Sequence, residues 1–455
     1  MVPPEILEFL RLPGRAFVIK GRAGTGKTLF ALELAREYQL NHGDVLWANS
    51  RDTDPGSIAE LEKVVGAEQH LRYADAVSPM EDALLAAEED LPTALAALED
   101  LALSAREAHR PLLVVDSLDG LTEGFSRSER ARFVTAAVRL ARRLNASLLL
   151  ILETVEPDPA DYLVDGVVVL RDESRDGARV RALYLEKLRG IALRRPAYAF
   201  TLSEGRFKAY VPQPEELPRR PVRPAARPDV EQRVSTGVAD WDLVLQGGFP
   251  RGTAHLLEVV PEAVAEYRRL LLPLVLNQLN LGRGVVALLP PNDPAADFEA
   301  ALLPFVGAPR KQAPALALRD TATLASAPAF GDYAVGPEER LAPLQVARTA
   351  HRERGPVVSV LSVDALVTAF GVAAAGPWLA RWVGETRRSR EDVDILLATL
   401  PEAVLLSAAL ADSRWRLDAA HEAILLRGRS PPTEHNFVIP SYARGFPETR
   451  LLPLH

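Results

Sequence analysis

One glycine-rich stretch near the start of this chain concentrates the residues that can do chemistry. It reads Gly21-Arg22-Ala23-Gly24-Thr25-Gly26-Lys27-Thr28 and fits the pattern GxxxxGK[ST] at every position. Glycines let such a loop curl so that its N–H groups point at an anion, and the following helix adds its positive end. In this pattern the lysine contacts the β- and γ-phosphates and the hydroxyl binds Mg²⁺. We therefore expect residues 21–28 to bind ATP and Mg²⁺ through Lys27 and Thr28.

A phosphate-bound magnesium ion also needs a carboxylate at the end of a neighbouring strand. The apolar run Leu112–Val115 ends in Asp116, which supplies one. Aspartate is also a common residue at the start of a helix, so Asp116 could cap the next segment, and the two roles are compatible. We expect Asp116 to belong to the metal site.

Short apolar runs and helical patterns alternate through the first 212 residues and must position this site. The expected strands are 16–19, 45–48, 112–115 and 147–152, and the expected helices are 28–38, 83–109 and 128–144. Apolar runs too short for helices, alternating with helices, predict an α/β fold with a mostly parallel sheet covered on both faces.

The length of the chain and a proline-rich stretch predict two domains. At about 100 to 200 residues per domain, 455 residues suggest two or three. Residues 212–227 read PQPEELPRRPVRPAAR, and such prolines favour an extended path. We expect a nucleotide-binding domain at 1–212, a Pro/Arg-rich linker at 213–230 and a second domain at 231–455.

The second domain resembles the first at matching positions. PGRAFVIKG around Gly14 is similar to PRGTAHLLE around Gly252, 238 residues later, and the tripeptide LRG recurs at 188–190 and 426–428 with the same offset. Between these matches, VVDSLDG around Asp116 is similar to LSVDALV around Asp364, 248 residues later. Three matches in the same order predict an internal duplication.

The predicted second copy lacks the phosphate-binding residues. At the offset of 238, Gly26, Lys27 and Thr28 map onto Val264, Ala265 and Glu266. A carboxylate at the last of these positions would repel phosphate. We therefore expect the second domain to be degenerate and to serve assembly or partner recognition.

Three blocks carry a resemblance to a known family. They read PPEILEFLRLPGRAFVIKGRAGTGKTLFALELA, PLLVVDSLDGL and LEKLRGIALRRPAYAFTLSEGRF. Together they span most of residues 1–212 and resemble the RecA/KaiC-like ATPase superfamily, most closely the archaeal gas-vesicle regulatory protein D family. The resemblance implies two tandem RecA-like three-layer lobes, the second degenerate, and a regulatory ATPase.

The residue that would activate water is the weakest point of the predicted site. RecA-like enzymes usually carry a glutamate just past the second strand, but residues 45–54, VLWANSRDTD, contain none. Asp52 is the nearest substitute and Asp54 the next, although aspartate is one methylene shorter. These acids could equally form a solvated turn with Pro55 and Gly56. Slow hydrolysis, or none, is expected.

The LEKLRG block implies a phosphate clamp. In KaiC-like rings, a lysine and an arginine of such a block reach the γ-phosphate of the neighbouring subunit, and the matching residues are Lys187 and Arg189. Two cations two positions apart on a strand point to the same side, which suits this task. A simple charge pair with Glu186 is the alternative. A clamp acting between subunits implies a homo-oligomer, either a dimer or a hexameric ring.

Composition and charge exclude several classes of protein. The chain has no cysteine, which excludes disulfides and thiolate chemistry, and its net charge of −8 disfavours general binding to nucleic acid. No segment reads as a signal peptide or a membrane span, so we expect a cytoplasmic protein. Two arginine clusters could be solvated charge or could dock DNA or an acidic protein: Arg219, Arg220, Arg223 and Arg227, and Arg387, Arg388 and Arg390.

Three functions fit these observations. The first is a KaiC-like regulatory ATPase whose nucleotide state controls a protein partner such as a transcription regulator. The second is a DNA-associated ATPase of the recombinase or repair type, which the acidic net charge disfavours. The third is a scaffold that senses nucleotide without hydrolysing it.

Overall fold

The computed structural model describes residues 1–49, 71–73, 110–175, 178–212, 218–306, 315–325 and 336–454. Asp52, Asp54 and the whole helix expected at 83–109 lie outside these ranges. The chain divides into two compact units, the first comprising Met1–Pro212 with Leu454–His455 and the second Gln213–Pro453. Each unit is described by itself below.

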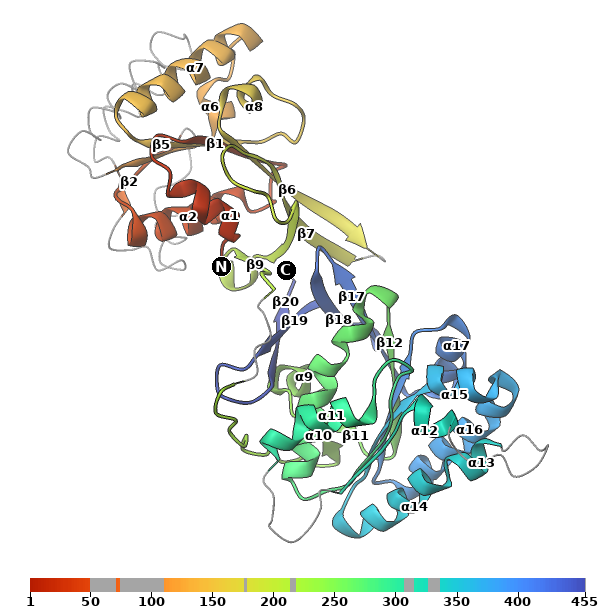
Figure 1. The fold of residues 1–455 in the computed structure, drawn as a ribbon. Helices are drawn as coiled ribbons and strands as arrows, with labels where there is room; N and C mark the ends of the chain where they lie inside the picture. Colours follow the sequence, from red (N-terminus) through yellow and green to blue (C-terminus); the bar gives the residue numbers. More distant parts are fainter. Residues whose placement is uncertain are drawn as a thin grey trace. The chain divides into compact units, whose positions relative to one another are not determined.

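The first unit is a layered α/β structure built on one sheet (Figure 1). Its strand order among the described residues is β3-β2-β4-β5-β1-β6-β7-β8-β9, parallel from β3 to β6 and antiparallel beyond. The strands are β1 (Ala16–Gly21), β2 (Val45–Asn49), β3 (Leu71–Tyr73), β4 (Leu112–Asp116), β5 (Ser147–Leu152), β6 (Gly166–Arg175), β7 (Ala178–Leu188), β8 (Ala197–Thr201) and β9 (Lys208–Ala209).

Helices cover both faces of this sheet, as the buried apolar strands require (Figure 1). Along β1, Ala16 and Val18 pack on one side, while Phe17 and Ile19 pack on the other. The helices on the first side are α6 (Leu118–Leu121), α7 (Arg127–Arg143) and α8 (Pro159–Leu163), and those on the second side are α1 (Pro4–Leu10) and α2 (Lys27–Asn41).

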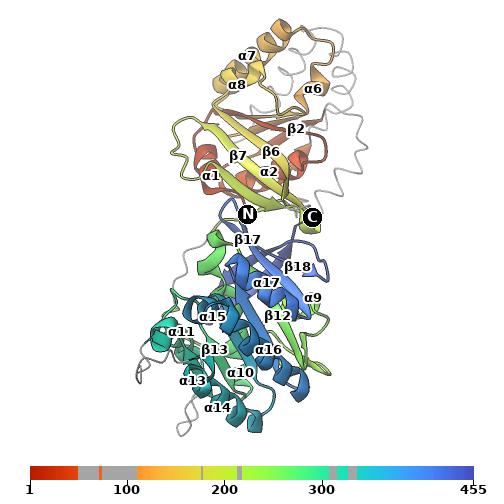
Figure 2. The ribbon, with the colours of Figure 1, turned by 90° about the vertical axis from the view of Figure 1, so that its right-hand side faces the viewer.

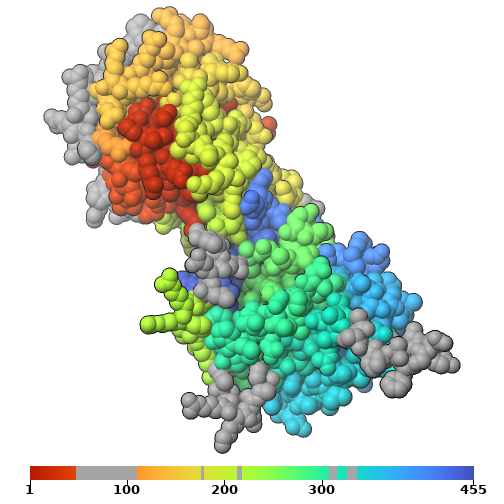
Figure 3. Space-filling model, in the orientation of Figure 1, coloured from red at the N-terminus to blue at the C-terminus, as the bar shows by residue number. Residues whose placement is uncertain are grey.

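The amino-terminal helix α1 is fixed against the antiparallel part of the sheet. The hydroxyl of Tyr198 on β8 donates to the buried carboxylate of Glu5 at 2.6 Å. Figure 3 shows the red amino-terminal segment on the surface of the first unit, beside the yellow-green strands. The segment that precedes the glycine-rich loop is therefore part of the folded unit.

The second unit repeats the strand order of the first. Its described sheet runs β14-β13-β15-β16-β12-β17-β18-β19-β20, again parallel up to the sixth strand. The strands are β12 (Thr253–Val259), β13 (Val285–Leu288), β14 (Leu316–Arg319), β15 (Val358–Ser362), β16 (Val393–Ala398), β17 (Ser413–Ala420), β18 (Ala423–Ser430), β19 (Asn436–Ser441) and β20 (Glu448–Pro453), and a separate pair is β10 (Arg233–Val234) with β11 (Phe249–Pro250). The predicted α/β class in two tandem lobes is thereby confirmed.

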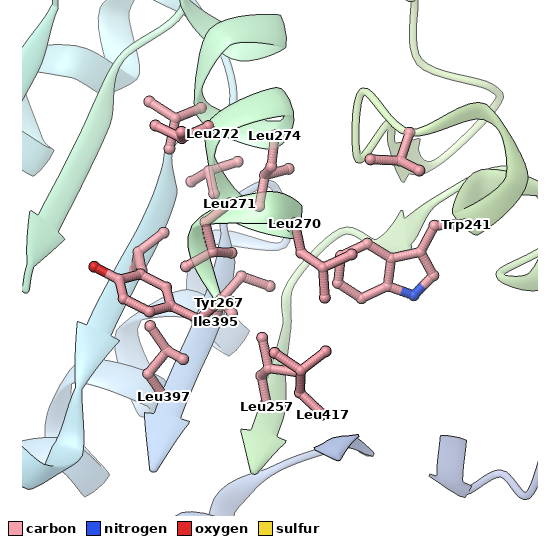
Figure 4. Close-up of a cluster of buried hydrophobic side chains, with 14 of the residues drawn as sticks. Trp241, Leu257, Tyr267, Leu270, Leu271, Leu272, Leu274, Ile395, Leu397 and Leu417 are labelled. Atoms are coloured by element: carbon pink, nitrogen blue, oxygen red, sulfur yellow. The ribbon is translucent and has the colours of Figure 1, made fainter. Parts of the chain in front are cut away.

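Helices again lie on both faces of the second sheet (Figures 1 and 2). One side carries α9 (Ala239–Val244), α10 (Arg268–Asn280) and α11 (Ala295–Leu302), and the other carries α12 (Thr321–Ala325), α13 (Pro337–Arg340), α14 (Ala342–His351), α15 (Val363–Phe370), α16 (Val372–Ser389) and α17 (Pro401–Leu410). Figure 4 shows Leu270 and Leu271 of α10 among Trp241, Leu257 and Leu417, which gives this side a continuous apolar core.

Strand register confirms the duplication at its first strand. Ala16 pairs with Leu148, and Ala254, 238 residues after Ala16, pairs with Asp394. Both sixth strands also carry a bulge at the same place, between Val167 and Val168 in β6 and between Arg414 and Trp415 in β17. The predicted offset of 238 therefore holds for β1 and β12.

The other two sequence matches are out of register. Leu185 pairs with Val168, whereas Gly428 pairs with Trp415, so the second LRG corresponds to residues 183–185 and not to 188–190. Insertions in the connections between strands shift the true offset along the chain, and a three-residue match cannot detect the shift.

The match around Asp116 is also displaced. Val115 pairs with Leu150 and Leu361 pairs with Leu396, which makes Ser362 the counterpart of Asp116. Asp364 lies two residues further along the chain than Ser362. The carboxylate predicted to bind the metal thus has no counterpart in the second unit, in agreement with the predicted degeneracy of that unit.

Described residues of the predicted linker are bonded to the second unit. Arg223 donates to the side chain and the carbonyl of Asn280, and Asn277 exchanges hydrogen bonds with the backbone of Arg227. Asp229 pairs with Arg283 at 2.9 Å. Residues 222–229 therefore pack against this unit. Two of the four linker arginines, Arg223 and Arg227, have partners within it.

A buried charge cluster lies beneath α14 and α16 in the second unit. Arg348 is 1% exposed, contacts Asp392 at 3.1 Å and lies over the ring of Trp382. Asp394 is fully buried, and burial raises its pKa despite the nearby guanidinium. Arg348 therefore compensates carboxylates that have no access to solvent.

We expect the Arg348→Ala substitution to destabilise the second unit by roughly 3 to 5 kcal/mol, because it removes the guanidinium that pairs with the fully buried Asp394 and one of the two that pair with Asp392. Urea unfolding followed by tryptophan fluorescence measures the change. Arg381→Ala is the control: it removes an exposed pair with Glu338 and should cost less than about 1 kcal/mol. Equal effects of the two substitutions would contradict this role for Arg348.

Candidate nucleotide-binding site

The glycine-rich loop connects the last residue of β1 to the first residue of α2. Gly24 and Gly26 have φ angles of 76° and 91°, a left-handed conformation that glycine adopts without steric cost. Gly21 is required for a different reason: a Cβ atom there would lie 2.6 Å from the Thr25 hydroxyl and 2.9 Å from the Leu170 carbonyl oxygen. The loop therefore takes the curled path that the sequence pattern predicts.

Lys27 lies at the start of α2 with its ammonium group turned back over the loop. The Nζ atom donates to the carbonyl of Arg22 at 2.9 Å and lies 3.5 Å from the carboxylate of Glu153. The side chain is 6% exposed. A bound phosphate would replace these two contacts with a stronger charge-assisted one.

The predicted metal residues lie together. The hydroxyl of Thr28 donates to the carboxylate of Asp116 at 2.8 Å, although the two residues are 88 positions apart. Hydroxyl and carboxylate oxygens are the ligands that Mg²⁺ prefers. The described residues contain no cluster of three or more His, Asp or Glu suited to a metal. Thr28 and Asp116 would thus hold Mg²⁺ together with water and phosphate oxygens, as is usual for this ion.

Glu153 is a site residue that the sequence reasoning missed. It is the first residue after β5, and its backbone N–H donates to Asp119 on α6. Asp119 in turn pairs with Arg130 on α7 at 2.8 Å. Its place directly after a buried strand is the sequence feature that could have indicated it, because the carboxyl ends of parallel strands share one edge of the sheet.

Lys187 and Arg189 lie away from the Thr28–Asp116 pair. Lys187 pairs with Val167 of β6, which in turn pairs with Val18 of β1. Val18 lies three residues before Gly21, so Lys187 is not at the end of the sheet that carries the loop. Its Nζ atom donates to the carbonyls of Asp161 and Val164. Burial lowers the pKa of Lys187, and Arg189 adds to that shift.

Arg189 is not on the strand. β7 ends at Leu188, and the guanidinium of Arg189 is 3.7 Å from Asp165 and 53% exposed. The expectation that both cations project from one strand is therefore wrong, because the strand stops between them. The alternative pairing with Glu186 is also absent, since Glu186 lies 3.6 Å from Arg171.

A polar pocket of about 650 Å³ opens beside the loop. Arg22 and Thr25 form its rim, and residues 155–157 form part of its wall. Buried Lys20 points into this region and is neutralised by Asp161 at 2.7 Å. The volume is within the usual range for sites that hold a small ligand.

The second arginine cluster is partly engaged within its own unit. Arg387 donates to the carbonyl of Leu410 and pairs with Asp412 at 3.2 Å, and Arg388 donates to the carbonyl of Gly384. These contacts favour a structural role for both arginines.

Comparisons with known proteins agree with this geometry. A family model described as GvpD gas vesicle protein, P-loop domain, matches residues 8–186. Protein GvpD2 of Halobacterium salinarum is 30% identical over 483 aligned residues, which cover 95% of this chain and 92% of GvpD2. This chain belongs to the GvpD family. Protein GvpD1 of the same organism is 28% identical over 64% of the chain and 57% of its own length.

The GvpD-like chain is also similar to a KaiC protein. The circadian clock oscillator protein KaiC of Acaryochloris marina is 25% identical over 52% of this chain and 46% of its own length. The predicted resemblance to GvpD and to RecA/KaiC-type P-loop ATPases is thereby confirmed. In the stretches that the structure describes, no helix has the length and apolar character needed to cross a bilayer.

We expect Asp116→Asn to weaken Mg²⁺-dependent ATP binding by roughly 10- to 100-fold, because a charged oxygen at the metal site becomes neutral. Titration with a fluorescent ATP analogue, with Mg²⁺ and with EDTA, measures the effect. In EDTA the variant and the parent should bind alike. A loss of the same size with and without Mg²⁺ would contradict the metal role.

Proposed function

We propose that this chain is a regulatory P-loop ATPase that binds ATP and Mg²⁺ in its first unit, hydrolyses ATP slowly and uses its nucleotide state to control a partner protein. The observation that carries the proposal is the Thr28–Asp116 hydrogen bond beside a correctly curled loop with Lys27 at its end. GvpD and KaiC relatives support the ATPase class. The pocket at Arg22 and Thr25 offers room for the nucleoside.

The partner in this proposal is a protein, for example a transcription regulator. The acidic net charge and the internal partners of Arg223 and Arg387 weigh against a general DNA-binding surface. The second unit has the same sheet topology without the catalytic groups, which suits a recognition module. The proposal does not extend to gas vesicles, because only the name of the family points to them.

The proposal includes a homo-oligomer in which Lys187 and Arg189 serve the site of a neighbouring subunit. Lys187 lies level with Val18, and Arg189 follows the end of β7, so neither lies at the sheet edge where Thr28 meets Asp116. The exposure of Arg189 leaves its guanidinium accessible to another subunit.

We expect Lys27→Ala to weaken ATP binding by roughly 10- to 100-fold, the loss expected for one charge-assisted contact to phosphate. Lys208→Ala, which removes a side chain paired with Glu204 on the surface, is the control and should bind like the parent. Titration calorimetry measures affinity, and phosphate release measures turnover. Equal affinity of the Lys27→Ala variant and the parent would overturn the proposed site. Tight binding without phosphate release by the parent would favour a non-hydrolysing scaffold.

We expect Arg189→Ala to lower phosphate release at saturating ATP while leaving ATP affinity within about threefold, because the guanidinium would act on charge that develops in the transition state. Mixing this variant with Lys27→Ala should give more activity than either alone, since one subunit contributes the loop and the other the arginine. Purely additive activity in the mixture would contradict action between subunits.

A further inference from the structure

Glu153 lies between the metal-site carboxylate and the glycine-rich loop. The sheet order places β5 between β4, which ends in Asp116, and β1, which leads into the loop. Because these strands are parallel, their carboxyl ends lie at one edge. The carboxylate of Glu153 is 3.5 Å from Nζ of Lys27, the atom expected at the β- and γ-phosphates. Glu153 thus contacts the same ammonium group that is expected to bind the terminal phosphates.

The duplicated second unit serves as an internal comparison for this residue. In the first unit, Asp119 accepts the backbone N–H of Glu153, and in the second unit Asp364 accepts that of Thr399 at 2.9 Å. Each aspartate is the second residue of the helix after its strand, and each donor is the first residue after the neighbouring strand. The backbone contact therefore belongs to the fold and does not require a nucleotide.

The side chain at this position, in contrast, changes together with the phosphate-binding groups. In the second unit a 3-10 turn at Pro261–Glu266 takes the place of the glycine-rich loop, Ser362 takes the place of Asp116 and Thr399 that of Glu153. A threonine satisfies the backbone contact as well as a glutamate does. The carboxylate of Glu153 is therefore retained only where a phosphate site exists, although it would repel a bound phosphate.

An anion beside phosphate is unfavourable unless a nearby cation offsets the repulsion or the anion takes part in the reaction. Hydrolysis requires a base near the water that attacks the γ-phosphate, and glutamate is a residue that commonly fills this role. Glu153 is 28% exposed, so water can reach it. When ATP binds, the terminal phosphate would compete with Glu153 for the ammonium group of Lys27.

We propose that Glu153 orients and deprotonates the attacking water, the role that the sequence suggested for Asp52. The assignment rests on the proposed ATPase activity. The water oxygen forms a bond to the γ-phosphorus while the bond from that phosphorus to the bridging oxygen breaks. The electron pair of the broken bond stays on the β-phosphate of ADP. The proton of the water passes to the Glu153 carboxylate and then to the released phosphate.

The test compares phosphate release and ATP affinity in five forms of the full chain: the parent, Glu153→Gln, Glu153→Asp, Glu123→Gln and Asp52→Asn. Glu153→Gln should lower the turnover rate by about 100-fold or more, the usual contribution of a general base. It should bind ATP at least as tightly as the parent, because one negative charge beside phosphate is removed. Glu153→Asp retains the charge and should retain part of the activity.

Glu123→Gln is the matched control, since it makes the same change on an exposed residue of the first unit that belongs neither to the glycine-rich loop nor to the pocket lining. It should behave like the parent. Turnover of Glu153→Gln equal to that of Glu123→Gln would overturn the assignment, as would loss of activity in Asp52→Asn alone. Weaker ATP binding by Glu153→Gln would show a structural role and also overturn it. A parent that binds ATP but releases no more phosphate than Lys27→Ala would instead refute hydrolysis itself.

Discussion

The carboxyl edge of three adjacent parallel strands, β4, β5 and β1, is the constraint on which this site depends. Parallel pairing brings the ends of these strands together, so that Asp116, Glu153 and the glycine-rich loop meet although they are far apart in sequence. The hydrogen bond from Thr28 to Asp116 connects the start of α2 to the end of β4. A change in strand order would separate the metal ligand from the phosphate loop without altering a single motif.

The charged and polar groups of the site are paired within the protein. Lys27 is held by a carbonyl and by Glu153, Thr28 by Asp116, and Lys20 by Asp161. Such pairing limits the cost of partly burying ionised groups. A phosphate bound at the loop would compete with Glu153 and the carbonyl of Arg22 for Lys27.

Duplication explains how one chain contains a lobe with the glycine-rich loop and a second lobe of the same topology without it. Both units share the strand order, the bulge in the sixth strand of that order, and an aspartate that accepts the backbone N–H of the residue after the fourth strand, Glu153 or Thr399. The second unit replaces the glycine-rich loop with a 3-10 turn at Pro261–Glu266. Its stability comes from its apolar core and from buried ion pairs such as Arg348 with Asp392. The fold therefore does not need the nucleotide site.

The sequence by itself determined the α/β class and the position of the glycine-rich loop, predicted Thr28 and Asp116 as its metal-binding partners, and indicated that the second lobe lacks such a loop. Those features are local, because spacing within a few residues fixes the curl of a loop or the end of a strand. Only the tertiary structure revealed Glu153 and removed Arg189 from the strand. It also showed that Asp364 is not the counterpart of Asp116. These depend on which strands are neighbours and on their register, and hydrogen bonds between distant segments leave no pattern in the local sequence.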